Sequence, residues 1–407
     1  MDETQLRNVV SKYLLPMFPG SRLLYETLPT SRKVDLASFS DPCTIAISLS
    51  FTPSSRLLVN RSQAFSHSDV VFASWFMAAV SEISELHSRD FFEALVENAV
   101  PSAISGYLTS QFQRARPAAF RIIRQLESWA AQTYEGQPIT CAIGIDSHEE
   151  NDQTPTLDQI WDHDFSAVLT SGLDTVLVAT QDLNVLSFDA LPPPKFTGLA
   201  PYRLMQLAEW TEQGRILFSL NRNGELLIFN QGNLSFAKRR GRWFHFPHES
   251  MARRLGRIGT TTLRESVYET CLDVSFARTG GCIAIISSSA ASRLGQIIHD
   301  DDLLSAPAIK SRCLQQIMQR PFPEMDRRLR QELVAIDGAT ILDHTGNLLS
   351  AGAIVEVPPG SHAGARRAAA IALARYGLAV KISHDGGILG FARDQDGMPP
   401  QVTCELG

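Results

Sequence analysis

Apolar and polar residues follow two different rhythms along this chain, and the changes between them predict its elements. Segments 3–13 and 70–87 place apolar residues three and four positions apart, which is typical of helices that pack on one side. Segments 43–51, 141–145 and 175–180 are short and rich in β-branched and apolar residues, which indicates strands. Helical and strand segments follow one another over the whole length, so we predict an α/β fold.

The order of these segments predicts three parts. Residues 1–135 form a separate N-terminal α/β domain, in which 103–134 contains a longer helix through 120–132. Residues 136–200 form a β-rich connecting segment, and the run Pro192-Pro193-Pro194 is a stiff linker near its end. Residues 201–407 form a C-terminal domain, for which we predict a mixed sheet flanked by helices.

The C-terminal domain opens with a strong hairpin signal. Segments 215–220 and 225–229 flank Asn223-Gly224, a dipeptide that favours the tight turn between two antiparallel strands. The elements predicted next are a helix at 264–277, a strand at 282–286, and helices at 312–320 and 324–334.

The stretch 335–393 contains the candidate chemistry. Its pattern predicts a strand, a tight turn, a strand, a glycine-containing loop, an alanine-rich helix, a strand, a glycine turn and a strand. We place the strand before the glycine-containing loop at 353–357. Two groups within the stretch have residue types that suit a phosphate, one at the start of a strand and one where the helix begins.

The first group is Asp337-Gly338-Ala339. The carboxylate of Asp337 could hold a divalent cation or activate a hydroxyl, and Gly338 lets the backbone approach a ligand. The second group is Gly364-Ala365-Arg366-Arg367. The first N–H groups of a helix have no partner inside it and lie at the positive end of the helix dipole, so arginines in that turn favour an anion. Each group alone is common in ordinary turns and helix caps, and only their order and spacing point to a site.

With these two groups in this order, the stretch resembles the diadenylate cyclase (DAC) domain, which joins two ATP molecules into cyclic di-AMP. That family has a DGA motif on a strand, an RHR motif opening a helix, and an acidic SEE-type turn between two late strands. Asp337-Gly338-Ala339 matches the first motif, and residues 268–286 resemble the helix and strand that precede the family's site. The resemblance covers about 215–397, and it implies that Ser287-Ser288-Ser289 borders the nucleotide.

The chain departs from the family at the other two motifs. Ala365-Arg366-Arg367-Ala368 stands where the family has RHR, and Ser383-His384-Asp385 stands where it has the acidic turn. A lost phosphate-binding arginine costs on the order of 2 kcal/mol, or about 30-fold in rate if it acts in the transition state. The pattern is similar to the divergent DAC-like sensor domains of the DACNV type, which are thought to bind nucleotides rather than make them.

Composition and charge limit the kinds of protein that this chain is expected to be. The chain has 407 residues, 44% of them hydrophobic and 20% charged, which is typical of a soluble globular protein. Its net charge of −6 argues against a general nucleic-acid coat protein. Its six cysteines show no CxxC spacing, which fits a reducing compartment. The acidic N-terminus and the short apolar run at 70–80 predict neither a signal peptide nor a membrane helix, so we expect a cytoplasmic protein.

Other motifs carry less weight. The basic run 238–243 either protects an exposed sheet edge or binds phosphates of a partner, and we favour the sheet edge. Asp162-His163-Asp164 is interpreted as a solvated loop, and His362 as an exposed loop residue that could contact a ligand. The sequence has no GxSxG, P-loop or HExxH motif.

Three hypotheses follow. The favoured one is a catalytically inactive sensor of a purine nucleotide, such as ATP, cyclic di-AMP or a relative, that signals to an effector protein not identified by the sequence. The alternative is an active diadenylate cyclase, which would need a homodimer that brings two sites face to face. In it, Asp337 and Asp385 would hold Mg²⁺ or Mn²⁺. The third is an interaction module that has lost the pocket.

Overall fold

The computed structural model describes residues 3–29, 36–49, 55–86, 89–110, 113–147, 154–161, 163, 169–255, 258–357, 364–393 and 399–406. The chain divides into two compact units, Met1–Pro247 (unit 1) and His248–Gly407 (unit 2). Both contain helices and mixed or antiparallel sheets, so the predicted α/β class is confirmed.

Unit 1 contains two sheets. The four-stranded sheet has the order β1-β4-β3-β2, and the seven-stranded sheet has the order β13-β12-β11-β10-β7-β8-β9. The strands are β1 Arg22–Pro29, β2 Ala37–Asp41, β3 Thr44–Ile47, β4 Ser55–Asn60, β7 Cys141–Ile145, β8 Thr175–Ala179, β9 Val185–Ala190, β10 Ile216–Leu220, β11 Leu226–Asn230, β12 Asn233–Arg239 and β13 Arg242–His245, with a small pair β5 Thr133–Tyr134 and β6 Gln137–Pro138.

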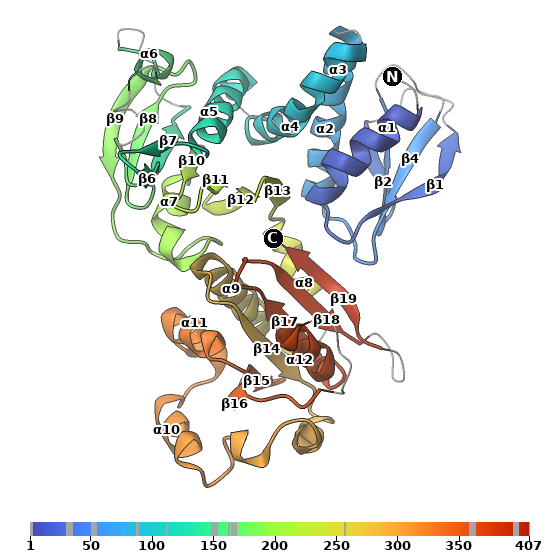
Figure 1. Ribbon diagram of the computed structural model, residues 1–407, viewed down its shortest axis with the longest axis vertical. Helices are drawn as coiled ribbons and strands as arrows, with labels where there is room; N and C mark the ends of the chain where they lie inside the picture. Colours follow the sequence, from blue (N-terminus) through green and yellow to red (C-terminus); the bar gives the residue numbers. More distant parts are fainter. Residues whose placement is uncertain are drawn as a thin grey trace. The chain divides into compact units, whose positions relative to one another are not determined.

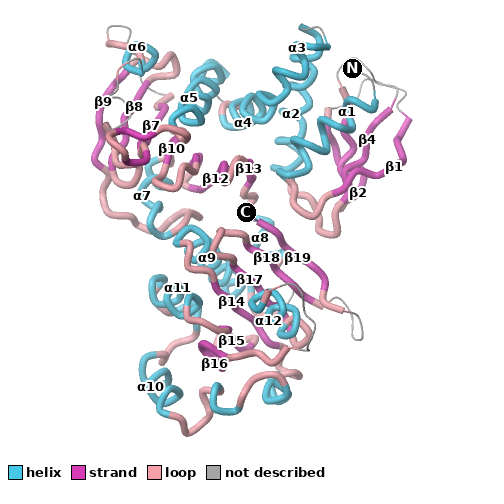
Figure 2. The backbone as a smooth tube through the Cα atoms, in the orientation of Figure 1, coloured by secondary structure: helices cyan, strands magenta, loops and turns pink. Residues whose placement is uncertain are grey.

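The described helices of unit 1 are α1 Glu3–Val9, α2 His67–Leu86, α3 Arg89–Leu95, α4 Ala99–Leu108, α5 Arg116–Trp129, α6 Leu157–Trp161 and α7 Met205–Trp210. Helices α2, α4 and α5 connect the two sheets. Helix α2 packs on β2 and β3, α5 packs on β10 and β11, and α4 lies between α2 and α5, an arrangement that can be followed in Figure 2. One continuous apolar core therefore runs from the small sheet to the large one.

The hairpin signal at Asn223-Gly224 is confirmed. Strands β10 and β11 pair in an antiparallel register from Ile216 opposite Asn230 to Leu220 opposite Leu226. In the turn, Asn221 Oδ1 accepts hydrogen bonds from the N–H groups of Asn223 and Glu225, and Gly224 has a φ of +68°.

The division of the chain differs from the sequence-predicted boundaries after 135 and 200. Strand β10 pairs with β7, so residues 216–245 complete the sheet that begins at 141 and belong with unit 1. The unit boundary falls at 247–248, past the proline run. The helix predicted through 120–132 is α5, which begins four residues earlier with Pro117 in its first turn.

Unit 2 is a six-stranded mixed sheet between helices. Its strands, in the order β16-β15-β14-β17-β18-β19, are β14 Gly281–Ile286, β15 Ala339–Asp343, β16 Leu348–Ala353, β17 Gly377–Ile382, β18 Ile388–Ala392 and β19 Gln401–Leu406. Its helices are α8 His248–Arg254, α9 Thr261–Ala277, α10 Ile309–Ile317, α11 Arg327–Ala335 and α12 Ala365–Leu373. Figure 1 shows α12 lying over β14 and β17.

Alternation along β14 explains why helices cover both faces of this sheet. Cys282, Ala284 and Ile286 form a core with residues of α12, while Ile283 and Ile285 between them are also fully buried and point to the opposite face. Helices α9 and α11 pack against each other, and α11 also contacts β14. A strand buried on both faces is continuously apolar, as this one is.

The strand predicted at 353–357 lies earlier than expected. It is β16, Leu348–Ala353, and Val355 only forms an isolated bridge with Ile298. The ladder between β15 and β16 shifts register twice, and Gly352 has a φ of +65°, so the pairing is irregular there before its last pair, Ala339 with Ala353.

Candidate functional site

Both sequence-predicted groups lie at one end of the unit 2 sheet. Strands β14 and β15 are parallel and begin there, while β17 is antiparallel to β14 and ends there, with Gly281 opposite Ile382. Asp337 stands just before β15, and α12 begins after β16 has run to this same end. We refer to it as the Asp337 end of the sheet.

Arg366 and Asp337 approach each other at this end. Arg366 Nη2 lies 3.9 Å from Asp337 Oδ1, at the limit of an ion pair. The Asp337 side chain is 96% exposed and that of Arg366 is 27% exposed. Such a long and exposed contact contributes little to stability, so both charged groups remain available to a ligand.

The guanidinium of Arg366 also lies close to Gly280, just before the start of β14. Gly280 has a φ of +69°, and a Cβ built on it would lie 2.5 Å from Arg366 Nη1 and 3.2 Å from the backbone nitrogen of His384. Burial raises the pKa of the nearby Cys282 thiol to about 12, although the charge of Arg366 opposes this shift. Arg366 therefore lies over the sheet end with its guanidinium directed at the same place as Asp337.

The glycine of the Asp337-Gly338-Ala339 group is required by packing. Gly338 has a φ of +101°, and a Cβ there would lie 2.6 Å from the carbonyl carbon of Gly352 and 2.7 Å from the carbonyl oxygen of Ala353. No side chain fits between these two backbones. Ala339, the next residue, is buried in the core of unit 2.

Sequence reasoning missed a lysine beside this backbone contact. Lys310 Nζ donates to the carbonyl oxygen of Gly352 at 3.2 Å and to Asp302 Oδ1 at 2.8 Å. Asp302 also accepts from the N–H of Ile354 at 3.0 Å, so it joins α10 to the end of β16. Burial works to raise the pKa of Asp302, but the Lys310 and Ile354 hydrogen bonds hold it below its ordinary value. A single lysine on a polar helix gives no sequence signal of this contact.

The turn 383–386 is tied to the end of α9. Arg278 Nη1 donates to the carbonyl oxygen of Asp385, His384 Nδ1 lies 3.2 Å from the carbonyl oxygen of Arg278, and Ser275 Oγ donates to the carbonyl oxygen of Gly386 at 2.5 Å. Arg278 itself adopts a left-handed conformation, with a φ of +60°, which is uncommon for a residue with a side chain. These contacts fix the backbone of the turn, while the side chains of His384 and Asp385 are exposed.

The start of α12 leaves its first turn uncapped by a side chain. Gly364, at the N-cap, has a φ of +78°, and its carbonyl oxygen accepts from the N–H groups of Arg367 and Ala368. Gly364, Ala365 and Arg367 are exposed. The preceding loop, which includes His362, lies outside the described residues.

The structure also bears on two other predictions, the serines near the ligand and the carboxylates for a divalent cation. Ser287-Ser288-Ser289 follows β14 and therefore lies at the opposite end of the sheet from Asp337, because β14 and β15 run parallel. The serines therefore do not lie beside Asp337, as they would if both groups bordered one ligand. Within the described ranges, no three His, Cys, Asp or Glu side chains are close enough to hold a metal ion. Asp337 and Asp385 remain the carboxylates that the resemblance assigns to a divalent cation.

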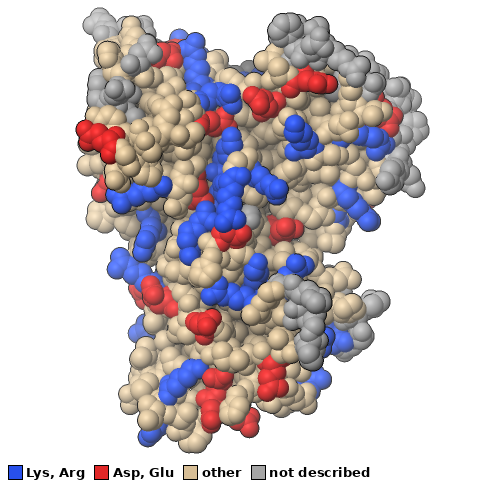
Figure 3. All heavy atoms as spheres, viewed as in Figure 1, with Lys and Arg blue, Asp and Glu red and all other residues tan. Residues whose placement is uncertain are grey.

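The basic run 238–243 spans the hairpin between β12 and β13, and only its last two residues lie in β13, the outermost strand of the seven-stranded sheet. Lys238 Nζ pairs with Glu127 at 2.6 Å, and the buried Arg239 pairs with Glu225 at 2.7 Å. Figure 3 shows basic side chains gathered along the middle of the viewed face, with a few acidic side chains beside them. Of the Asp162-His163-Asp164 triplet, only His163 lies within the described residues.

Comparison with known proteins adds little to the description of this site. No family model matches this chain, and no curated protein matches it. A solved structure described as a hypothetical membrane spanning protein from Bacillus cereus is similar to 37% of this chain, at 16% sequence identity and a TM-score of 0.26. The match spans 66% of that protein's length, just under two thirds, and a TM-score this low supports no argument. In the described parts of this chain, every helix is too short or too polar to cross a membrane.

Proposed function

We propose that unit 2 is a nucleotide-binding sensor whose Asp337 end receives the phosphates of a purine nucleotide. The observation that supports this most is the approach of Arg366 and Asp337, which are 29 residues apart by subtraction and come from different elements. An exposed helix start, an arginine and a carboxylate then face one small region of the surface. Arginine's planar fork suits phosphate oxygens, and hydrogen bonds of this charged kind contribute roughly 1.5–3 kcal/mol each.

In this proposal each residue has a separate role. Arg366 binds a phosphate group with its guanidinium, and the first N–H groups of α12 add the positive end of the helix dipole. The exposed Arg367 adds positive charge in the same turn. The carboxylate of Asp337 is negatively charged and would repel the phosphates. It would instead bind either a sugar hydroxyl or a cation that accompanies the phosphates.

The alternative is an active diadenylate cyclase that uses the same residues. The carboxylate of Asp337 is exposed, as a group that holds a metal–nucleotide complex must be. A bound Mg²⁺ or Mn²⁺ would supply charge stabilisation for the leaving pyrophosphate. A second copy of the chain would have to present the other ATP.

Binding and product formation test the two functions together. The full chain is titrated calorimetrically with ATP and with cyclic di-AMP, with and without Mg²⁺ or Mn²⁺, and the ATP mixtures are analysed by mass spectrometry. We expect saturable binding that Arg366→Ala weakens about ten-fold or more, since it removes a charge-assisted contact. Arg375→Ala is the matched control, because Arg375 is exposed just past the other end of α12.

The outcomes separate the hypotheses. Formation of cyclic di-AMP that Asp337→Asn abolishes would replace the sensor with the cyclase. Absence of binding for every nucleotide, or equal affinity in wild type and Arg366→Ala, would remove both and leave an interaction module.

A further inference from the structure

Helix α10 of unit 2 presents an apolar stripe to solvent. Ile309, Cys313 and Ile317 follow one another at intervals of four residues, which places them on one face of the helix. Ile309 is 73% exposed, Ile317 is 59% exposed, and Cys313 is exposed as well. Ser311, on the opposite face, is buried, and its Oγ donates to the carbonyl oxygen of Leu303 at 2.8 Å. The helix is therefore attached to unit 2 by its polar side, and the described residues leave its apolar side uncovered.

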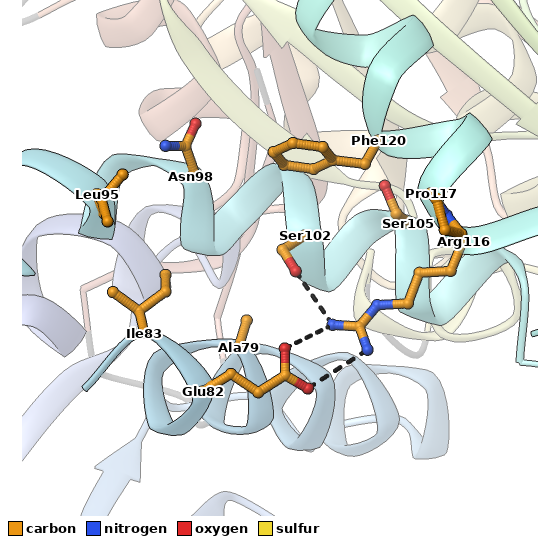
Figure 4. Close-up of a pocket in the computed structure, with 10 residues that line it drawn as sticks. All are labelled: Ala79, Glu82, Ile83, Leu95, Asn98, Ser102, Ser105, Arg116, Pro117 and Phe120. Atoms are coloured by element: carbon orange, nitrogen blue, oxygen red, sulfur yellow. Dashed lines mark hydrogen bonds and ion pairs between the residues drawn. The ribbon is translucent and has the colours of Figure 1, made fainter. Parts of the chain in front are cut away.

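The apolar pocket of unit 1 is of a different kind. It has a volume of about 560 Å³ and lies between α2, α3, α4 and α5 (Figure 4). Its charged groups are already paired, since Arg116 donates to both carboxylate oxygens of Glu82, at 3.4 and 3.2 Å. Next to the α10 stripe, by contrast, the exposed side chains of Arg312 and Arg320 make no ion pair or hydrogen bond among the described residues. The stripe, unlike the pocket, thus shows which chemistry would cover it.

The stripe is symmetric about Cys313. One isoleucine lies four residues before it, and the other lies four residues after it. If a second α10 crosses the first in the antiparallel sense around a two-fold axis at Cys313, Ile309 of each copy lies beside Ile317 of the other. A ridge of residues four apart also packs well into the groove of a facing helix. The stripe therefore fits a second copy of itself.

The charges at the two ends of α10 favour the same pairing. Before the helix lies the acidic turn Asp300–Asp302, in which Asp302 is paired with Lys310 at 2.8 Å and Asp300 is exposed. After the helix lies the exposed Arg320, and the helix itself contains no acidic residue. An antiparallel pair brings the acidic end of one copy to the basic end of the other, whereas a parallel pair would place like charges together.

We infer that α10 is a contact through which two copies of this chain associate. Cys313 lies at the two-fold axis, Ile309 packs against Ile317 of the second copy, and Asp300 lies beside its Arg320. A single short helix from each copy makes a small interface, so the dimer is weak and its population depends on protein concentration. The pairing is independent of the nucleotide proposal, because none of these residues is assigned to the nucleotide.

Sedimentation velocity of the full chain without nucleotide tests the association. We expect a monomer–dimer equilibrium between about 1 and about 500 μM, the range for a small interface. Ile317→Glu puts like charges into the apolar contact and should weaken the dimer about ten-fold or more. Phe188→Glu is the matched control and should leave it unchanged, because Phe188 is 55% exposed but lies on β9 of unit 1.

Cys313 reports on the orientation of the two helices. Of the six cysteines, all within the described residues, only Cys313 is exposed. A short bis-maleimide should join two copies covalently, and Cys313→Ser should abolish this product. Arg320→Glu should weaken the dimer about ten-fold by placing two carboxylates together, and adding Asp300→Arg to that variant should restore the affinity.

The wild-type measurements need no variant, so a misfolded variant does not leave the inference untested. A chain that remains monomeric over the whole concentration range would overturn it, and the stripe would then be left to a different protein. A dimer that persists unchanged in Ile317→Glu, or that the bis-maleimide does not join at Cys313, would also overturn it, because the contact would lie elsewhere on the chain.

Discussion

Gly280 leaves the space that the guanidinium of Arg366 occupies, since a Cβ at position 280 would lie 2.5 Å from Arg366 Nη1. Gly280 follows the end of α9, whereas Arg366 is in the first turn of α12. The direction of the arginine is thus set by a residue that is remote in sequence and carries no chemistry of its own.

Gly280→Ala should therefore weaken nucleotide binding about ten-fold by displacing the Arg366 guanidinium. The positive φ adds a destabilisation of about 1 kcal/mol. Gly136→Ala is the matched control, because Gly136 has a φ of +76° and no described atom within 4 Å of its ideal Cβ. Calorimetric titration and denaturant unfolding measure the two effects. If Gly280→Ala binds nucleotide as the wild type does, Arg366 does not depend on this contact.

Gly338→Ala should destabilise unit 2 regardless of any ligand. A Cβ would lie within 2.6 Å of the backbone of β16, and the φ of +101° is unfavourable for alanine. Overpacking of this kind costs about 1–3 kcal/mol, with about 1 kcal/mol more for the backbone conformation. Gly364→Ala, with a φ of +78° and no described atom near its Cβ, should show only the conformational cost. Equal unfolding free energies for the two variants would contradict the packing role of Gly338.

Local patterns were enough to predict the order of elements in 335–393. The turn after β15, for example, is fixed by Asp343, whose Oδ1 accepts from the N–H groups of Thr345 and Asn347. Burial works to raise the pKa of Asp343, yet hydrogen bonds from the side chains of Thr345 and Asn347, together with those from their N–H groups, lower it overall. That order of elements starts β15 and α12 at the same end of the sheet, so it places Asp337 and Arg366 at one end, while the direction of the Arg366 side chain also depends on Gly280.

Features that depend on distant partners could not be predicted. The sequence around 216–220 does not reveal that β10 pairs with β7, about 75 residues earlier by subtraction, and this pairing sets the unit boundary. Gly280 and Lys310 gave no signal, because their importance comes from what they contact in three dimensions. The serines at 287–289 follow the end of β14 as expected, but the parallel pairing of β14 and β15 puts them at the opposite end of the sheet from Asp337, and local patterns did not reveal this.

Asp302 should make unit 2 sensitive to acid. Its folded-state pKa lies below the ordinary value of 3.8, so its contribution to stability is present above that pH and is lost as the pH falls through the lower folded value. Asp302→Asn should reduce the unfolding free energy by about 1 kcal/mol at pH 7, and the difference should shrink below pH 4. Chemical denaturation at several pH values measures this. Asp301→Asn is the control, since Asp301 is adjacent but its side chain is 75% exposed. An undiminished difference at pH 3 would exclude a role for the charge.

Asp69 of unit 1 holds a buried cation. Arg61 Nη2 lies 2.6 Å from Asp69 Oδ2, and the two side chains are 4% and 1% exposed. Asp69 Oδ2 also accepts from the N–H of Ser66, while Ser66 Oγ accepts from the N–H of Asp69, which forms a capping box at the start of α2. His245 Nδ1 of β13 is 3.4 Å from the other carboxylate oxygen. One carboxylate thus joins the first turn of α2 to both sheets.

Asp69→Ala should cost about 3–5 kcal/mol of unfolding free energy, because it leaves Arg61 charged and buried without its carboxylate. Asp158→Ala is the comparison, since Asp158 pairs with Arg121 but both side chains are more than 40% exposed, and exposed pairs contribute about 1 kcal/mol or less. Urea unfolding followed by the fluorescence of the tryptophans measures both. A loss as small for Asp69→Ala as for Asp158→Ala would mean that water or another group compensates Arg61. The buried carboxylate would then not be what connects α2 to the two sheets.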